Sequence, residues 1–326
     1  MSSETSSHAW CLACREKVAD VDAEERSLLI DLADQLLREG RGTSLVAEIC
    51  DSGLAAALWA DTQAWGALLE RQGATAATSP LLDLVTLRDW YSDRDHRLVL
   101  PMPGSAGPAA RSTPDDHVVV EGVLLGRDNR RHAIVSDQDL VAWSVPLDSL
   151  EAESAAGLDH ELGVIVVRGL AQAVRLAESA SSIEALASRA IGWELIGVGE
   201  AALAMAVEHA TARTQFGRPI AAFQVVAHRL AQSRVDLSAA RALLAGIDGG
   251  ALAAAIAKAV AGSAALQALA AAQQVCGAMG FTAEFGLHRL VRRGYLLDAL
   301  LGGSEAAPAR IAGLLAAGGL PRLVAL

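Results

Sequence analysis

The sequence predicts a mostly helical protein with a small β region in the middle of the chain, an α+β fold. Hydrophobic residues make up 52% of the 326 residues but aromatic residues only 4%. The core must therefore consist mainly of Ala, Leu and Val, and Ala and Leu are strong helix formers. Four long helical patterns are joined by short turns, as is typical of an antiparallel bundle, and they cover residues 186–212, 220–247, 251–276 and 284–301. A group of short β-like runs precedes them.

Residues 1–95 are expected to form an N-terminal helical domain. Acids from Asp22 onward favour the first turn of a helix. Its core-facing positions at helical spacing are Leu28, Leu29, Leu32 and Leu36. Further helical segments are predicted over 54–59, 65–71 and 81–90, the last after Ser79-Pro80.

Residues 96–180 are expected to form a reduced antiparallel β domain. The stretch P-M-P-G-S-A-G-P (101–108) has the composition of a loop. Five short β-like runs follow with turn residues between them, which favours a small sheet or barrel. These runs begin at His117, Val123, His132, Leu140 and Gly163. So small a domain leaves little room for long loops around a ligand.

Residues 181–326 are expected to form a C-terminal four-helix bundle. Two of its helices carry apolar stripes at spacings of three, four and seven residues, which predicts core-facing sides. The stripes are Phe223, Val226, Leu230, Leu237 and Leu244 in one helix and Leu287, Leu290, Val291 and Leu297 in another.

The charge balance excludes some classes of function. A net charge of −11 and a pI near 5.2 argue against a general nucleic-acid binder, which needs a basic excess. The start, M-S-S-E-T-S-S-H-A-W-C, lacks the pattern of a signal peptide, so a cytoplasmic protein is expected. The most apolar window, Ala251–Ala272, is as long as a membrane span, but it is mostly alanine and contains Lys258 and Gln267. We therefore expect a packed helix of a soluble protein and no membrane span.

Four cysteines do not make a disulfide framework in a chain of this size. Cys11 and Cys14 form a C-x-x-C, which could be half of a zinc site or a redox pair, whereas Cys50 and Cys276 stand alone. No second C-x-x-C or suitably spaced His pair follows, so no metal site is predicted.

Residues 212–220 read A-R-T-Q-F-G-R-P-I and lie between two predicted helices. A helix-to-helix turn accounts for Gly217, which gives a permissive backbone, and for Pro219, which suits the first turn of the second helix. It does not account for Arg213 and Gln215. Because a planar guanidinium binds phosphate oxygens bidentately, the stretch is either a turn alone or a grip on an anion.

Two long motifs in this order resemble the acyl-CoA dehydrogenases. They are R-x-Q-F-G-R-P-I-x-x-F-Q-x-x-x-H-R-L-A from Arg213 and Q-x-x-G-A-x-G-F-T-x-E-x-x-L-H-R from Gln274. The order of helices, β region and helical bundle agrees with the fold of that family. The resemblance is strong from about Arg189 to the end, moderate around L-E-R-Q-G-A-T-A-A-T-S-P-L-L (69–82) and poor over 95–180.

The resemblance implies an FAD site shared between subunits. In the family, the arginine and glutamine of these motifs grip the FAD pyrophosphate of a neighbouring subunit, and this carries over to Arg213 and Gln274. Phe216 and Gln224 are implied to lie near the flavin. The other reading of Gln274 is a polar helix residue before a glycine cap.

A glycine pair in the second motif is implied to let backbone N–H groups approach the diphosphate closely. The first member is Gly277, but the second is Ala278. The departure is mild, because alanine still leaves close approach plausible.

The resemblance also identifies a missing catalytic base. Acyl-CoA dehydrogenation needs a carboxylate that removes the α-proton while a hydride moves to the flavin. The family's Y-E-G-T stretch corresponds to Leu301-Gly302-Gly303-Ser304, so Gly302 stands at the base position. The second position used in the family falls at about Ala187, again without a carboxylate.

Four nearby acids could replace the base: Asp298, Glu305, Glu184 and Glu194. Each is better explained as a helix-end charge or an ion-pair partner, because a base must lie within hydrogen-bond reach of its proton. Asp298 and Glu305 are the candidates nearest to the vacant position.

The β domain lacks family features that surround the isoalloxazine ring. The T-E-P-G-x-G-S stretch is reduced to 100–107, without its acid, and Trp143-Ser144 is the nearest echo of a W-x-S-N stretch, without its Asn. The chain keeps the residues that reach across an interface and lacks those that hold the ring.

We interpret this asymmetry as that of a partner subunit in an α2β2 acyl-CoA dehydrogenase of the actinobacterial steroid-degradation type. A second chain would carry the catalytic glutamate, the substrate would be an acyl-CoA, and an electron-acceptor flavoprotein would reoxidise the FAD. Two alternatives stay open: a self-sufficient homotetramer with Asp298 or Glu305 as base, and a non-catalytic scaffold of the same fold.

Overall fold

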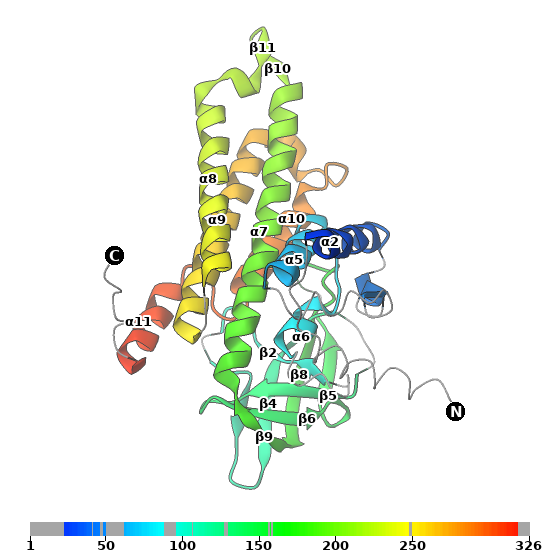
Figure 1. Cartoon of the computed structure of the whole chain (residues 1–326), viewed down its shortest axis with the longest axis vertical. Coiled ribbons are helices and arrows are strands. Elements are labelled where there is room, and N and C mark those ends of the chain that lie inside the picture. Colours follow the sequence, from blue (N-terminus) through cyan, green and yellow to red (C-terminus); the bar gives the residue numbers. More distant parts are fainter. Residues whose placement is uncertain are drawn as a thin grey trace.

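Figure 1 shows the computed structural model of the chain, with a long helical bundle above a β region and the N-terminal helices against one side. The residues it describes are 23–40, 42–45, 48–49, 62–87, 96–105, 107–126, 130–155, 157, 159–247 and 250–318. Cys11, Cys14 and Cys50 and the predicted segments 54–59 and 88–90 lie outside them.

The described N-terminal part is helical. Its elements are α2 (Ala23–Arg38), η1 (Gly42–Ser44), α5 (Thr62–Thr75) and α6 (Leu81–Thr86). In α2, Leu29 and Leu36 are fully buried, as predicted, but Leu28 is 53% exposed. Neighbouring residues of a helix point about 100° apart, so Leu28 and Leu29 cannot both face the core.

The middle region forms two sheets where one was predicted. Their strands run in the orders β1-β5-β6-β9 and β2-β4-β8-β7, with β3 also paired to β4. All pairs are antiparallel except the parallel pair β1–β5. The strands are β1 (His96–Leu98), β2 (Leu100–Pro101), β3 (Ala110–Ser112), β4 (His117–Leu124), β5 (His132–Ser136), β6 (Val141–Pro146), β7 (Glu151–Ser154), β8 (Ile165–Gln172) and β9 (Val174–Ser179), with η3 (Leu147–Ser149) between β6 and β7.

The difference from the predicted five strands has a physical reason. The two runs predicted at His117 and Val123 are one strand, β4, because its alternate residues all point into the same core. Strands β1 to β3 are two or three residues long, and β7 is exposed throughout. Neither kind of strand shows the apolar alternation by which strands are predicted.

The C-terminal part confirms the predicted bundle. Its helices are α7 (Ala180–Ala212), α8 (Gln224–Gly246), α9 (Ala251–Cys276) and α10 (Leu287–Ala299), and a further helix, α11 (Ala307–Gly318), packs on α9. Of the predicted stripes, Leu237, Leu244, Leu287 and Leu297 are fully buried. Phe223 was wrongly placed among the core-facing positions, because it precedes α8, is half-buried and packs against the hairpin residue Phe216. The chain is thus mostly helical with a small β region, as the composition predicted.

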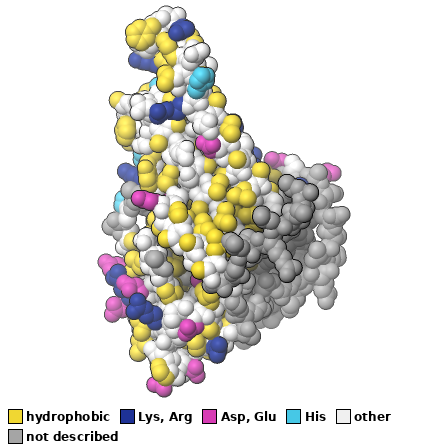
Figure 2. All heavy atoms as spheres, turned by 90° about the vertical axis from the view of Figure 1, so that its left-hand side faces the viewer, with side chains coloured by type: hydrophobic (Ala, Val, Ile, Leu, Met, Phe, Trp, Pro, Cys, Tyr) yellow, Lys and Arg dark blue, Asp and Glu magenta, His cyan; other side chains and the backbone are white. Residues whose placement is uncertain are grey.

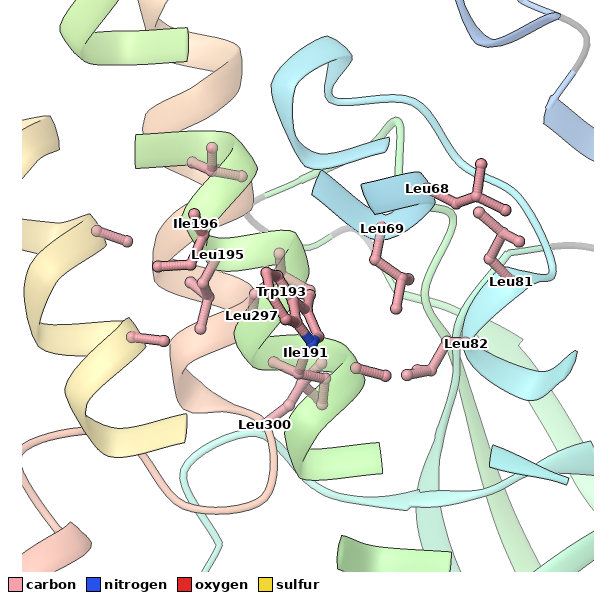
Figure 3. Close-up of a cluster of buried hydrophobic side chains, with 14 of the residues drawn as sticks. Leu68, Leu69, Leu81, Leu82, Ile191, Trp193, Leu195, Ile196, Leu297 and Leu300 are labelled. Carbon is pink, nitrogen blue, oxygen red and sulfur yellow. The ribbon is translucent and has the colours of Figure 1, made fainter. Parts of the chain in front are cut away.

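One apolar core joins the N-terminal helices to the bundle. Figure 3 shows leucines of α5 and α6 facing Trp193 and its neighbours on α7, with Leu297 and Leu300 beyond them. Helices α5 and α7 touch at backbone level, since a Cβ on Gly197 would lie 1.9 Å from the carbonyl oxygen of Glu70. Small residues are therefore required at this contact, because a side chain there would force the helices apart.

Two described helices are long and apolar enough to cross a membrane, Ala180–Ala212 and Ala251–Phe281. The apolar windows of these helices are 72% and 56% buried inside the protein. Their burial against one another agrees with the predicted role of bundle core.

Candidate functional site at the bundle tip, and the cleft at the base position

The first motif folds into a β-hairpin at the end of the bundle. β10 (Thr214–Gln215) pairs with β11 (Arg218–Pro219), and the two tip residues, Phe216 and Gly217, have φ angles of 53° and 80°. A two-residue hairpin turn with positive φ at both positions suits glycine and costs energy at phenylalanine. The expectation that Pro219 stands in the first turn of the second helix was wrong, because the connection forms a hairpin. Pro219 lies in β11, and α8 begins only at Gln224, after η4 (Ile220–Ala222).

Aromatic contacts brace the hairpin and leave its tip in solvent. The ring of Phe223 makes an edge-to-face contact with Phe216, with centroids 6.1 Å apart, and the guanidinium of Arg218 lies 4.2 Å from its centroid. Phe216 is nonetheless 92% exposed. A large apolar side chain held this far out in solvent is typical of a contact surface.

The second motif ends α9. Gln274 is exposed in the last turn, and the amide of Gly277 caps the helix by donating to the carbonyl of Gln273. Gly277 has a φ of 56°, and a Cβ there would meet no atom within 4 Å. Ala278 is exposed within η5 (Gly277–Phe281). The glycine cap that one interpretation of Gln274 required is therefore present. The surface beside this cap is open to an approaching group.

Both motifs lie at the same end of the bundle. The amide of Arg213 donates to the carbonyl of His209 at 2.9 Å. The ring of His209 contacts that of Phe285, in the loop between η5 and α10, at 6.0 Å. The six predicted cofactor-binding residues are all exposed there: Arg213, Phe216, Gln224, Gln274, Gly277 and Ala278.

The residues at this end fit a diphosphate group. An exposed guanidinium and an exposed amide are available as donors, and Gly277 leaves room for close backbone approach. Among the described residues, no Asp or Glu forms an ion pair with Arg213. Whether these residues bind flavin remains a prediction.

The base position lies at the opposite end of the bundle, where a cleft of about 480 Å³ separates the β region from α7, α11 and the loop between α10 and α11. Its floor is formed by Leu301 and Gly302, with φ angles of 53° and 83°. The full lining is Pro101, Gly104, Ser105, Gly107, Pro108, Asp137, Gln138, Leu140, Glu184, Leu301, Gly302, Ala306, Ala309 and Arg310.

Two cations hold the backbone of this floor. The ammonium of Lys258, 2% exposed in α9, donates to the carbonyls of Asp298 and Gly302, both at 2.7 Å. Burial lowers the pKa of Lys258 to about 8, although the neighbouring Asp298 acts in the opposite direction. The guanidinium of Arg310 donates to the carbonyl of Leu301. The loop is fixed by carbonyl contacts and carries no carboxylate at position 302.

Asp298, the first candidate replacement for the base, is engaged in structure. Its carboxylate accepts hydrogen bonds from the amide of Ser304 at 3.1 Å and from the hydroxyl of Ser304 at 3.2 Å. Gly262 lies against it, since a Cβ there would be 2.1 Å from its Oδ1. Asp298 is 8% exposed and is not among the residues that line the cleft.

The remaining acids are also unsuited to act as the base. Glu305 is exposed and outside the cleft lining. Glu184 lines the cleft but pairs with Arg310 at 3.6 Å. Asp137 also lines it, and its carboxylate accepts hydrogen bonds from the indole of Trp143 and from two backbone amides. Burial would raise the pKa of Asp137, but these hydrogen bonds outweigh burial and lower it. Ala187, the second family position, is fully buried.

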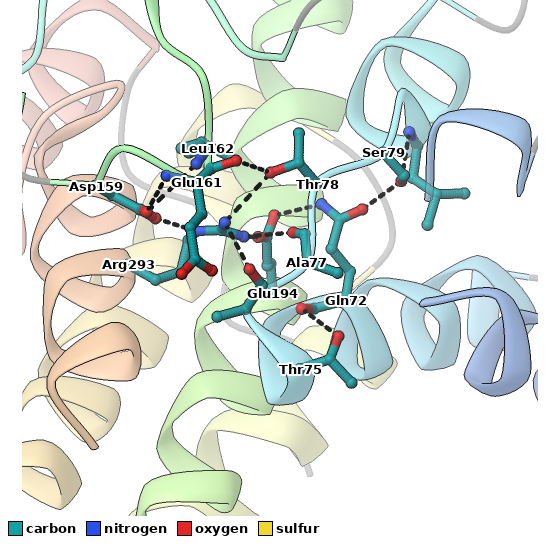
Figure 4. A network of polar contacts seen from close by, with 12 residues as sticks. Gln72, Thr75, Ala77, Thr78, Ser79, Asp159, Glu161, Leu162, Glu194 and Arg293 are labelled. Atoms are coloured by element: carbon teal, nitrogen blue, oxygen red, sulfur yellow. Dashed lines mark hydrogen bonds and ion pairs between the residues drawn. The ribbon is translucent and has the colours of Figure 1, made fainter. Parts of the chain in front are cut away.

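Glu194 belongs to a buried network, drawn in Figure 4. Arg293, which has no exposed surface, pairs with Glu194 at 2.9 Å and with Asp159 at 2.5 Å. The amide of Gln72 donates to the other oxygen of Glu194 at 3.0 Å. Burial raises the pKa of Glu194, although Arg293 acts against this. The network joins α5, α7, α10 and the loop at Asp159, so Glu194 is a structural residue.

Three residues important to this architecture were not predicted from the sequence: Lys258, Arg293 and Arg310. Lys258 is the one charged residue of α9, and an isolated lysine in an alanine-rich helix is a signal that a buried partner exists. Its partners are carbonyl groups some 40 positions away, which no local pattern indicates.

A helical bundle joined to a small two-sheet β region and flanked by N-terminal helices defines the class as that of acyl-CoA dehydrogenase-like folds. A family model described as "Acyl-CoA dehydrogenase, C-terminal domain" matches residues 185–313. This part of the chain, the helical bundle, is therefore similar to the C-terminal domain of acyl-CoA dehydrogenases.

Curated acyl-CoA dehydrogenases also match this chain, over part of their length. Acyl-CoA dehydrogenase FadE34 of Mycobacterium tuberculosis is 36% identical over 154 residues, which cover 44% of this chain and 22% of the relative. The short-chain specific acyl-CoA dehydrogenase of Megasphaera elsdenii is 34% identical over 111 residues, 30% of this chain and 28% of the relative. The matched segment thus spans less than a third of either relative.

Solved structures share the fold over nearly the whole chain. A variant of the Tcur3481-Tcur3483 steroid ACAD has a TM-score of 0.73 at 24% identity, covering 90% of this chain and 98% of the other. The ChsE4-ChsE5 complex from Mycobacterium tuberculosis has a TM-score of 0.72 at 21% identity, covering 93% and 99%. At these identities the likeness establishes the fold alone.

Proposed function

We propose that this chain is the base-lacking subunit of a flavin-dependent acyl-CoA dehydrogenase and completes the FAD site of a partner chain. One observation carries the proposal. The residues that resemble the family's cross-subunit FAD contacts are all exposed at the bundle tip, whereas no carboxylate in the described lining of the cleft is free to act as a base. A chain that retained only one half of a shared site would have this distribution.

FAD bound in the complex would accept the hydride that leaves the β-carbon of the thioester. The part played by this chain is binding: Arg213 holds the diphosphate oxygens bidentately, and Gln274 donates its amide to the same group. The open backbone at Gly277 admits close approach. The partner contributes the isoalloxazine pocket and the glutamate that removes the α-proton.

The proposed substrate of the complex is an acyl-CoA thioester, with a steroid-derived acyl group as the candidate, and an acceptor flavoprotein is proposed to take the electrons. The steroid candidate is supported by fold similarity to a structure described as a steroid ACAD, and the two-chain assembly by similarity to one described as a complex. We propose a cytoplasmic location.

Expression of the chain alone and together with each base-bearing acyl-CoA dehydrogenase chain of its source genome tests the proposal. We expect the chain alone to be colourless and one co-expressed pair to be a yellow complex that reduces a dye with acyl-CoA. A yellow, active homotetramer of this chain would contradict the proposal, and a stable complex without flavin would identify a scaffold.

A further inference from the structure

The bundle tip is basic although the chain is acidic. The chain carries 38 Asp and Glu against 27 Lys and Arg, yet residues 209–235 contain four arginines, two histidines and no acid. Figure 2 shows blue and cyan side chains at the top of the molecule, with magenta ones only further down. This distribution separates the tip electrostatically from the rest of the surface.

Three of these arginines have no acidic partner among the described residues. Arg213, Arg218 and Arg229 are exposed and form no ion pair within the described chain, whereas Arg234, further along α8, pairs with Glu200. We define the basic tip as Arg213, Arg218, His228 and Arg229. Exposed like charges on one short segment repel one another in the isolated chain, so an acidic surface bound there would relieve the repulsion.

One diphosphate does not account for the whole tip. Arg213 suffices for bidentate phosphate binding, and Arg218 and Arg229 are not among the positions carried over from the family's FAD site. The guanidinium of Arg218 lies on the face of Phe223, 4.2 Å from the ring centroid. A stacked guanidinium is held in place and keeps its N–H edge for an acceptor. The hairpin therefore presents a fixed cation beside the exposed ring of Phe216.

We propose that Arg218 and Arg229 dock on an acidic rim of the partner chain around its FAD pocket, while Arg213 reaches the diphosphate inside. The inference rests on the proposed function, since it requires a partner acyl-CoA dehydrogenase chain. It assigns the two arginines to assembly and to electrostatic steering, which acts mainly on the association rate. Flavin affinity in the formed complex is assigned to Arg213.

The experiment measures the association rate of the separately purified chains by stopped flow, as a function of salt. Variants Arg218→Glu and Arg229→Glu are compared with Arg111→Glu, which reverses an exposed arginine of β3 in the middle region. At about 20 mM salt we expect each tip reversal to slow association about tenfold, and the difference to shrink as screening increases. Arg111→Glu should leave the rate unchanged.

Arg218→Gln and Arg229→Gln, which remove the charge without reversing it, should give intermediate effects, and unchanged melting curves exclude misfolding. If the tip variants associate as fast as Arg111→Glu at all salt concentrations while a yellow complex still forms, the inference is overturned and the proposed function stands. If the unmodified chain forms no flavin complex with any base-bearing chain, both are overturned.

Discussion

The two ends of the helical bundle differ in what their charged residues do. At the cleft end, Lys258 and Arg310 are buried or half-buried and bind carbonyls and a carboxylate of their own chain. At the hairpin end, Arg213, Arg218 and Arg229 are exposed, and none forms an ion pair with a described residue. Charges that hold a fold together are satisfied within the chain, whereas charges that serve a partner are left available. This difference supports our proposal that the tip is a binding surface, whereas the charges at the cleft end stabilise the fold.

The largest effect is expected in the buried network around Arg293, where the charges are satisfied within the chain. Arg293→Met would leave Asp159 and Glu194 buried without their cation, which should lower the free energy of unfolding by about 3–5 kcal/mol. Urea denaturation measures it. The matched control is Arg289→Met on the same helix, whose exposed pair with Glu161 should contribute less than about 1 kcal/mol. Equal effects of the two variants would show that the buried ion pairs of Arg293 stabilise the fold no more than an exposed pair does.

The next effect concerns flavin at the tip. Arg213→Ala in the assembled complex removes one charge-assisted contact to the diphosphate, which should weaken FAD retention about 10- to 100-fold. Fluorescence of released flavin on dilution measures this. Arg234→Ala, which removes an arginine engaged with Glu200 within the chain, should leave retention unchanged. Unaltered retention in Arg213→Ala would mean that this arginine does not contact the cofactor.

Lys258 makes stability depend on pH in a defined direction. Its pKa in the folded protein is lowered from 10.5 to about 8, mainly by burial, so above pH 8 the unfolded chain binds more protons than the folded one. The free energy of unfolding should therefore rise between pH 8 and pH 10.5. The contribution of Lys258 to it should be smallest below pH 8. Lys258→Met should remove that rise, whereas Gln267→Met on the same helix should keep it. Thermal melts at several pH values measure both.

The smallest effect on stability is expected at the hairpin tip. Phe216→Asn removes a side chain that is 92% exposed and places at a positive φ a residue that tolerates it. The free energy of unfolding should change by less than about 0.5 kcal/mol, while assembly with the partner chain should weaken. A large loss of stability would show that the ring is part of the fold rather than of a contact surface.

The sequence predicted the long helices and their buried faces well. Apolar residues at helical spacing, such as Leu230, Leu237 and Leu244, occur because one face of the helix packs against the core along its length. It did not predict strands as short as β2 or as exposed as β7, because these are held by neighbouring strands rather than by their own pattern. The second sheet, with its parallel pair β1–β5, depends on contacts between distant segments. The three-domain division at 95 and 180 remains a prediction.

The candidate site was predictable to the extent that it depends on motif spacing. Gly302 at the base position and Arg213 beside Phe216 could be located by counting along the family's motifs. The hairpin was missed because Phe216 adopts a left-handed backbone that phenylalanine rarely takes. The role of Asp298 in holding the loop was missed because its partner, Ser304, is brought to it by the turn between α10 and α11, which no local sequence pattern predicts.

We infer that the partner chain, and not this chain, supplies the catalytic base. The most direct test of this inference is the acyl-CoA-dependent dye reduction by the assembled complex in which the partner's catalytic glutamate has been changed to glutamine, with flavin content measured on the same sample. We expect a fully yellow complex with activity reduced to background, because no carboxylate in the described lining of this chain's cleft is free to act as a base. Substantial remaining activity, abolished by Glu184→Gln or Asp298→Asn in this chain, would contradict it.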